Sequence, residues 1–246
     1  HAWGWTVCKL SKTAPGQTAL LLMVGGGIFA GARWQEDLQP IIQRCQTTEP
    51  LQIGLGPVRE KIVEIIKEQT GPEARILWLD AHGDYNTPET SGSGYLGGMC
   101  LAAATGEWDA GLGDPLPAER VVLAGIRDLD PGERELLEKS PATVIGASAI
   151  ETLVAAKNAL DGAPVFVHLD LDVLDPEHFP AAVPAPGGLH PDKLYDLVDS
   201  VLEDSELVGL EVTAFEAPED EEERAVATET AMHVLEPFLD QLAGRE

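Results

Sequence analysis

The chain is poor in positive charge. Its 246 residues include 16 Lys and Arg against 42 Asp and Glu, and the formal net charge is −26. Such a charge repels the phosphates of nucleic acids and of anionic membrane surfaces, so we expect neither to be a partner. Solubility or a salty habitat would equally account for the acidity, which says nothing about the fold.

Cysteine and long apolar runs are also scarce. The three cysteines, Cys8, Cys45 and Cys100, are odd in number and widely spaced. This predicts reduced thiols in a cytoplasmic protein rather than a disulfide framework. The stretch "TALLLMVGGGIFAGA" resembles a signal-peptide core, but it is too short and too rich in glycine to span a bilayer. We interpret it as a buried strand that enters a glycine turn, with a targeting segment as the alternative.

Short apolar runs are present in a regular alternation with amphipathic segments. This alternation predicts parallel βαβ units and a sheet covered on both faces. No internal repeat or low-complexity linker interrupts residues 1–246, which favours a single α/β domain. The predicted strands are 19–25, 51–55, 75–80, 120–125, 142–146, 165–170 and 207–212. The predicted helices lie near 36–46, 58–69, 132–139, 149–160, 190–204 and 222–243.

Acidic side chains cluster after two of the predicted strands. In each cluster they occupy alternate positions, so they share one face of the strand. Parallel sheets bind their ligands beyond the carboxyl ends of the strands, and buried carboxylates that converge there require protonation or a cation. Oxygen ligands with one imidazole suit Mn²⁺ or Mg²⁺. A capped strand end or a polar turn is the alternative for either cluster alone. The residues are Asp80, His82, Asp84, Asp170 and Asp172.

Three motifs around these residues resemble the signatures of the arginase family, the ureohydrolases. They read "DAHGDYNTPET", "GIRDLDPGE" and "HLDLDVLDP". The "GYLGGM" segment is similar to the family branch that hydrolyses Nω-hydroxy-L-arginine. The resemblance implies a three-layer α/β/α domain whose mainly parallel sheet has about eight strands. It also implies a site for one or two Mn²⁺ ions and leaves a homo-oligomer open.

The resemblance assigns metal-binding roles residue by residue. Asp80 and Asp170 would bridge two ions, and His82 and Asp172 would complete one ion's site. Asp84 would bind the other ion and also act in catalysis, through a hydrogen bond to the attacking water.

The same resemblance assigns substrate contacts. Asn86 and Ser93 match positions that contact a substrate carboxylate, and Asp130 matches one that helps to bind an α-amino group. Asp128 and Glu133 lie beside Asp130. The alternative for these three acids is a turn and a helix N-terminus, where negative charge suits the helix dipole.

The chain departs from the family pattern at three places. Pro57 falls near the position of a further metal ligand, and Gly97 stands where arginases carry a proton-shuttling histidine. Ala214 falls where family members carry a glutamate that contacts the guanidinium group, and Glu216 is a candidate substitute. His178 is the first candidate for a replacement proton shuttle and therefore for a catalytic role.

The expected function is hydrolysis of a linear, non-peptide C–N bond in a small molecule. The substrate would be a guanidino or N-hydroxyguanidino amino acid, and the product urea or hydroxyurea. A binding or regulatory protein with this fold is one alternative, and a single-metal hydrolase of a substrate such as formiminoglutamate is another. His168, two residues before Asp170, is interpreted as a hydrogen-bonded core histidine rather than a ligand.

Overall fold

The computed structural model describes residues 5–11, 19–25, 51–53, 73–110, 114–147, 149–215 and 217–243. The helices predicted near 36–46 and 58–69 lie outside these residues, as do Pro57 and Glu216.

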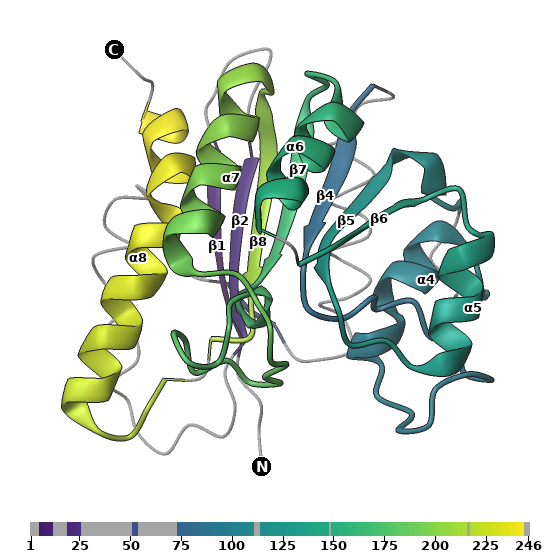
Figure 1. The fold of residues 1–246 in the computed structure, drawn as a ribbon, viewed down its shortest axis with the longest axis horizontal. Helices are drawn as coiled ribbons and strands as arrows, with labels where there is room; N and C mark the ends of the chain where they lie inside the picture. The colour runs from purple at the N-terminus through teal and green to yellow at the C-terminus, as the bar shows by residue number, and fades with distance from the viewer. Residues whose placement is uncertain are drawn as a thin grey trace.

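A parallel sheet of five strands forms the centre of the described structure, in the order β6-β5-β4-β7-β8 (Figure 1). Each of its strands begins and ends within one residue of the predicted bounds. Near-continuous apolar runs made this prediction possible, because strands buried on both faces carry few polar side chains. The strands are β4 (Arg75–Leu79), β5 (Val121–Ile126), β6 (Thr143–Gly146), β7 (Val165–Asp170) and β8 (Leu207–Thr213).

A second, antiparallel sheet comes from the N-terminal part of the chain. It has the order β2-β1-β3, and β2 lies beside β8 (Figure 1). Its strands are β1 (Trp5–Ser11), β2 (Ala19–Gly25) and β3 (Leu51–Ile53). The α/β class with a mainly parallel sheet is therefore confirmed. The eight strands of the described residues are divided between two sheets, and β1 was not predicted.

Helices cover both faces of the parallel sheet and make three layers. On one face, Leu77 and Leu79 of β4 join a core that includes residues of α6 (Ala149–Leu160), α7 (Pro191–Asp204) and α8 (Glu221–Ala243). On the other face, Ile76 and Trp78 pack with residues of α4 (Cys100–Thr105) and α5 (Pro131–Lys139). The alternation along β4 is the period of two that a strand imposes.

The predicted helix bounds are confirmed for α5, α6, α7 and α8, whereas α4 was not predicted. Local chemistry fixes the start of α5. Asp130 is its N-cap, Pro131 occupies the first turn, and Glu133 completes a capping box. The connections between the described elements include the short 3-10 helices η1 (Gly97–Met99), η2 (Ala118–Arg120) and η3 (Leu171–Val173).

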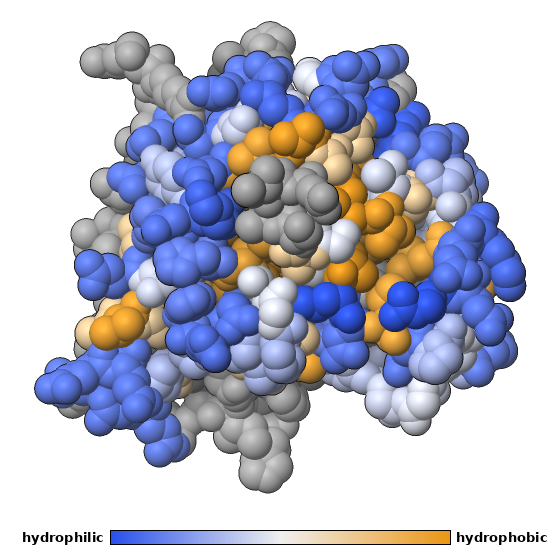
Figure 2. All heavy atoms as spheres, in the orientation of Figure 1, coloured by the Kyte–Doolittle hydropathy of each residue, from blue (hydrophilic) through white to orange (hydrophobic). Residues whose placement is uncertain are grey.

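The surface is mostly polar in the orientation of Figure 1. Figure 2 shows hydrophilic side chains around the rim of this face and apolar side chains nearer its middle. Val144 on β6 and Val154 on α6 are among the exposed large apolar residues. Within the described part of the chain, no helix combines the length and the apolar character that crossing a membrane would require.

Candidate metal centre

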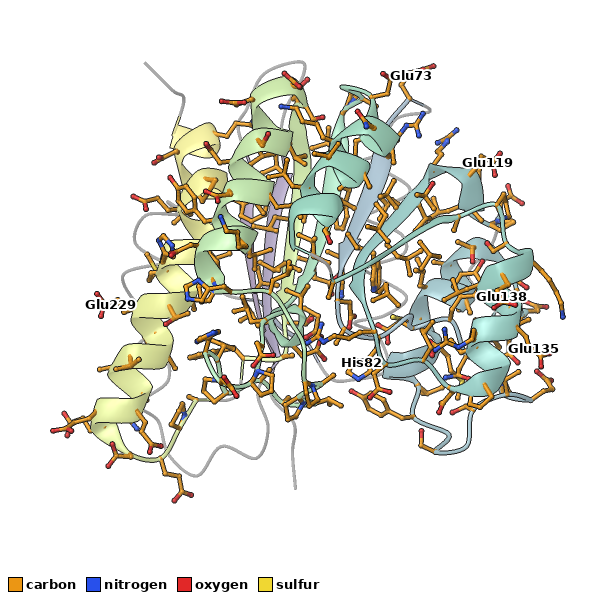
Figure 3. All side chains as sticks on the ribbon, viewed as in Figure 1. Glu73, His82, Glu119, Glu135, Glu138 and Glu229 are labelled. Carbon is orange, nitrogen blue, oxygen red and sulfur yellow. The ribbon has the colours of Figure 1, made fainter. Side chains whose placement is uncertain are left out.

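The two acidic clusters meet at the carboxyl ends of neighbouring strands. β4 pairs with β7 in parallel, and Leu79 lies opposite Leu169. Asp80 and Asp170 therefore stand side by side in the register. Glu73 and His82, both labelled in Figure 3, lie near the opposite ends of β4, with His82 among the loops at its carboxyl end. This is the edge of a parallel sheet at which ligands bind.

The first group of candidate ligands is Asp80, His82 and Asp172, whose donor atoms all lie within 4.8 Å of one another. His82 Nδ1 is 3.0 Å from Asp172 Oδ2 and 3.4 Å from Asp80 Oδ1. The backbone N–H of Ala81 donates to Asp172 Oδ1 at 3.0 Å, which fixes that carboxylate. Two carboxylates and an imidazole at this spacing suit a divalent cation.

The second group is Asp80, Asp84 and His168, again within 4.8 Å of one another. His168 Nε2 faces Asp80 Oδ2 at 3.8 Å, so the two oxygens of Asp80 point toward different groups. Asp84 has a φ of 50°, in the left-handed region that non-glycine residues seldom adopt. Such strain is typical of functional sites.

The cluster concentrates negative charge in a buried place. Burial raises the pKa of Asp84 and that of Asp170 well above the usual range, and nearby carboxylates add to both shifts. Burial also raises the pKa of Asp172. For Asp80 the effect of burial is outweighed, because contacts with His168 and His82 lower its pKa well below the usual value. A bound cation would favour the ionised form of all four acids.

The same carboxylates favour the charged form of the His82 imidazole. Burial alone would lower the pKa of its imidazole, but hydrogen bonds to Asp172 and Asp80 raise that pKa to about 11. In the absence of a metal, the His82 proton therefore supplies part of the positive charge that the carboxylates require.

Asp170, predicted to bridge two ions, belongs to neither group. Its Oδ1 accepts from the backbone N–H of Asp172 at 2.8 Å, and its Oδ2 accepts from Thr213 Oγ1 at 2.8 Å. Asp170 therefore holds η3 and β8 together at the sheet edge.

His168 forms the hydrogen bond expected of a core histidine. Its Nδ1 lies 2.9 Å from Glu211 Oε2 on β8, and its ring stacks on Trp78 with centroids 3.6 Å apart. Trp78 Nε1 also donates to Asp80 Oδ2 at 3.3 Å. Sequence reasoning missed the roles of Glu211 and Trp78. The available signal was a glutamate inside an otherwise apolar strand.

The predicted substrate residues fall into two sets. Asn86 Nδ2 donates to Asp130 Oδ2 at 3.0 Å, which joins two of them beside the site. Glu133 is buried and accepts from the backbone N–H groups of Tyr85 and Asp130, so both of its carboxylate oxygens are hydrogen-bonded within the protein. These contacts match the helix N-terminus alternative.

The other two predicted substrate residues are exposed. Asp128 Oδ2 lies 3.9 Å from His82 Nε2, and its side chain is 70% exposed. Ser93 lies in an exposed loop, where its Oγ accepts from the backbone N–H of Tyr95 at 3.1 Å.

The remaining predicted positions lie around the site. His178 is exposed in the turn after η3, edge-on to the ring of His190 at 4.5 Å between centroids, and joins neither ligand group. At Gly97, an added Cβ would meet the ring of Tyr95 at 2.2 Å. Ala214 has a φ of 60°, which also lies in the left-handed region.

Fold and site together define an α/β protein with two overlapping groups of carboxylate and imidazole donors at the carboxyl edge of a parallel sheet. The model of the arginase family matches residues 58–238, which is most of the chain. The chain belongs to the arginase family.

Individual relatives agree with this assignment. The chain is 40% identical over 174 residues to the N(omega)-hydroxy-L-arginine amidinohydrolase of Streptomyces lavendulae, covering 71% of this chain and 63% of that protein. It is 32% identical over 177 residues to the arginase of Plasmodium berghei, covering 64% and 50%. The chain thus spans less than two thirds of the length of these two curated relatives. The crystal structure of Bacillus subtilis arginase aligns with a TM-score of 0.62 at 25% identity, over 77% of each chain.

Proposed function

We propose that the chain is a metal-dependent hydrolase that cleaves a C–N bond of an N-hydroxyguanidino or guanidino amino acid. The observation that carries the proposal is that Asp80 belongs to both ligand groups. A carboxylate shared between two donor groups suits a pair of divalent cations. The excess of oxygen donors over imidazoles favours Mn²⁺ over zinc.

Each ligand has a defined part. Asp80, His82 and Asp172 would hold one cation, and Asp84 would share a second with Asp80. A bound pair would lower the pKa of a water molecule and so supply a nucleophile at neutral pH. Asp84 would orient that water and accept its proton. Cys100 Sγ holds Asp84 in place by donating to its Oδ2 at 3.3 Å.

The substrate class follows from the surroundings of the ligands. The paired Asn86 and Asp130 offer amide and carboxylate groups for the polar end of an amino acid. Gly97 carries no side chain, so the proton-shuttling histidine that the family resemblance implies at this position is missing, and the ring of Tyr95 lies where a Cβ would stand. An N-hydroxyguanidine is less basic than a guanidine, and its leaving group requires less help from a general acid. The relative from Streptomyces lavendulae, described as an N(omega)-hydroxy-L-arginine amidinohydrolase, supports the same choice.

His178 is the proposed proton donor to the leaving amine. Imidazole is the side chain best suited to proton transfer near neutral pH, and an exposed turn lets it exchange protons with solvent. The chain is also proposed to act on a free small molecule in the cytoplasm, where its three cysteines would stay reduced.

The test is turnover by the chain loaded with Mn²⁺. Nω-hydroxy-L-arginine, L-arginine and formiminoglutamate are supplied in parallel, and the released products are quantified. We expect hydroxyurea from the first substrate, at a rate exceeding urea release from the second. Chelation should abolish turnover and Mn²⁺ should restore it. Bound Mn²⁺ without turnover of any substrate would favour the binding protein, and turnover of formiminoglutamate alone would overturn the substrate assignment.

A further inference from the structure

The imidazole of His168 is held rigidly at the carboxyl end of β7. Its side chain is only 5% exposed. Trp78, its register partner on β4, stacks against it with 10° between the ring planes. On the side away from the shared carboxylate, Nδ1 lies 2.9 Å from Glu211 Oε2. These contacts leave the ring no freedom to turn, so the direction in which Nε2 points is fixed by the fold.

Nε2 points toward Asp80 and Asp84, the other two members of the second ligand group. Among the described residues, His168 Nε2 is the buried side-chain nitrogen or oxygen that has no hydrogen-bond partner. Leaving such a buried atom without a partner is unfavourable. Its neighbour Asp80 Oδ2 is 3.8 Å away, too far for a hydrogen bond. Two atoms that bind one cation at about 2.1 Å lie about 3–4 Å apart, which accommodates this separation.

We propose that His168 is a metal ligand, and that its Nε2 completes the site of the second cation with Asp80 and Asp84. The proposal rests on the metal-dependent function proposed above. The family resemblance implies a further metal ligand near Pro57, and the side chain of proline has no atom that binds metal. His168 supplies the imidazole from β7 instead. Each cation is then held by one imidazole, His82 for the first and His168 for the second.

Glu211 completes the arrangement as a positioning residue. If Nδ1–H donates to Glu211 Oε2, the lone pair of Nε2 is free to face the cation. A carboxylate behind a ligating histidine is the usual outer partner of a metal site, because it fixes the ring and its tautomer. A histidine that only filled the core would place Nε2 against a partner or an apolar wall. Here the ring faces Asp80 and Asp84, both of which are themselves candidate ligands.

The experiment isolates the second site by removing the first imidazole. In the His82→Asn variant, Mn²⁺ bound by the remaining group should show ¹⁴N coupling from an imidazole in pulsed electron paramagnetic resonance. This coupling should be lost in the His82→Asn/His168→Asn double variant. The His82→Asn/His233→Asn variant is the control, because His233 is a partly exposed residue of α8 paired with Asp192. Melting by circular dichroism verifies that each variant is folded.

Glu211→Gln keeps the buried shape and tests the same idea if His168→Asn fails to fold. It should weaken Mn²⁺ binding at the second site by about 10–100-fold. Nitrogen coupling that survives in the double variant, or Mn²⁺ affinity unchanged by Glu211→Gln, would overturn the role of His168. Both results are compatible with turnover by the unaltered chain, so the proposed function would survive them. An unaltered chain that binds no Mn²⁺ would sink the proposed function and this inference together.

Discussion

At the residue scale, Asp80 links the two ligand groups, because its two carboxylate oxygens face different donors. Oδ1 accepts from the backbone N–H of His82 at 2.7 Å, and Oδ2 accepts from Trp78 Nε1 at 3.3 Å. Both oxygens are thus oriented before any cation arrives. Pre-oriented ligands reduce the free-energy cost of ordering a site when it binds.

Removing either outer carboxylate tests whether two cations act together. In Asp172→Ala one group loses a ligand and the 3.0 Å partner of His82, and in Asp84→Ala the other group loses a ligand. We expect kcat/KM to fall by more than about 100-fold in both, which corresponds to about 2.7 kcal/mol of transition-state stabilisation. Asp196→Ala, which removes an exposed carboxylate on α7, is the control. Near-normal activity in Asp84→Ala alone would instead indicate a single-metal enzyme.

The raised pKa of His82 predicts how the metal-free protein responds to pH. A group whose pKa is about 11 when folded and 6.5 when unfolded stabilises the fold fully below the lower value. That stabilisation is lost progressively as the pH rises toward the higher value. The melting temperature of metal-stripped protein should therefore fall between about pH 7 and about pH 9. The fall should be smaller in His82→Asn, and an identical fall in both proteins would contradict the assignment.

Residue spacing predicted part of the site and missed the rest for a physical reason. Alternate positions after an apolar strand are visible in the sequence, and they single out Asp80, His82 and Asp84. Spacing along one strand cannot reveal a contact with the next strand, and His168 meets Glu211 only through the register of β7 and β8. Asp170 illustrates the same limit, because its hydrogen bond to Thr213 also crosses to β8.

At the element scale, the position of the site is fixed by an inner strand of the parallel sheet. β4 is flanked by β5 and β7, and its apolar side chains are buried on both faces. Buried runs of this kind are conspicuous in a sequence, which is why the five parallel strands were predicted. α4 was missed because it has only six residues and follows a glycine pair, and its first turn is tied to the site by Leu101 N–H donating to Asp84 O at 3.0 Å.

A substitution that removes core packing from β4 should destabilise the strand that carries Asp80 at its carboxyl end. Leu79 is fully buried directly before Asp80. Leu79→Ala should reduce the free energy of unfolding by about 2–5 kcal/mol, because the cavity cannot close completely. Chemical denaturation of metal-free protein measures this change. Val226→Ala on α8 removes an apolar side chain that is 62% exposed, and its effect should stay within about 0.5 kcal/mol. Equal losses in the two variants would contradict the described packing.

At the scale of the whole molecule, the negative net charge affects which ligands approach the site. A net charge of −26 raises the local concentration of divalent cations and disfavours polyanions. An oligomer and a single domain over the full chain stay predictions.

Metal binding should stabilise the whole fold, because the ligand groups exist only when β4 and β7 are paired. Mn²⁺ at about 100 times its dissociation constant should add about 2.7 kcal/mol for one site. Thermal melting with and without Mn²⁺ measures the gain, and a chelator should reverse it. Mg²⁺ at the same concentration is the comparison cation. A melting temperature unaffected by Mn²⁺ would indicate that the groups do not bind it.

The most direct measurement is the number of Mn²⁺ ions bound per chain after equilibrium dialysis, in the unaltered protein and in Asp80→Asn. If Asp80 is shared, the unaltered chain binds two ions and the single substitution removes or severely weakens both. Asp196→Asn should retain two. An Asp80→Asn variant that keeps one tightly bound ion would contradict the shared carboxylate, and with it the two-cation account of this site.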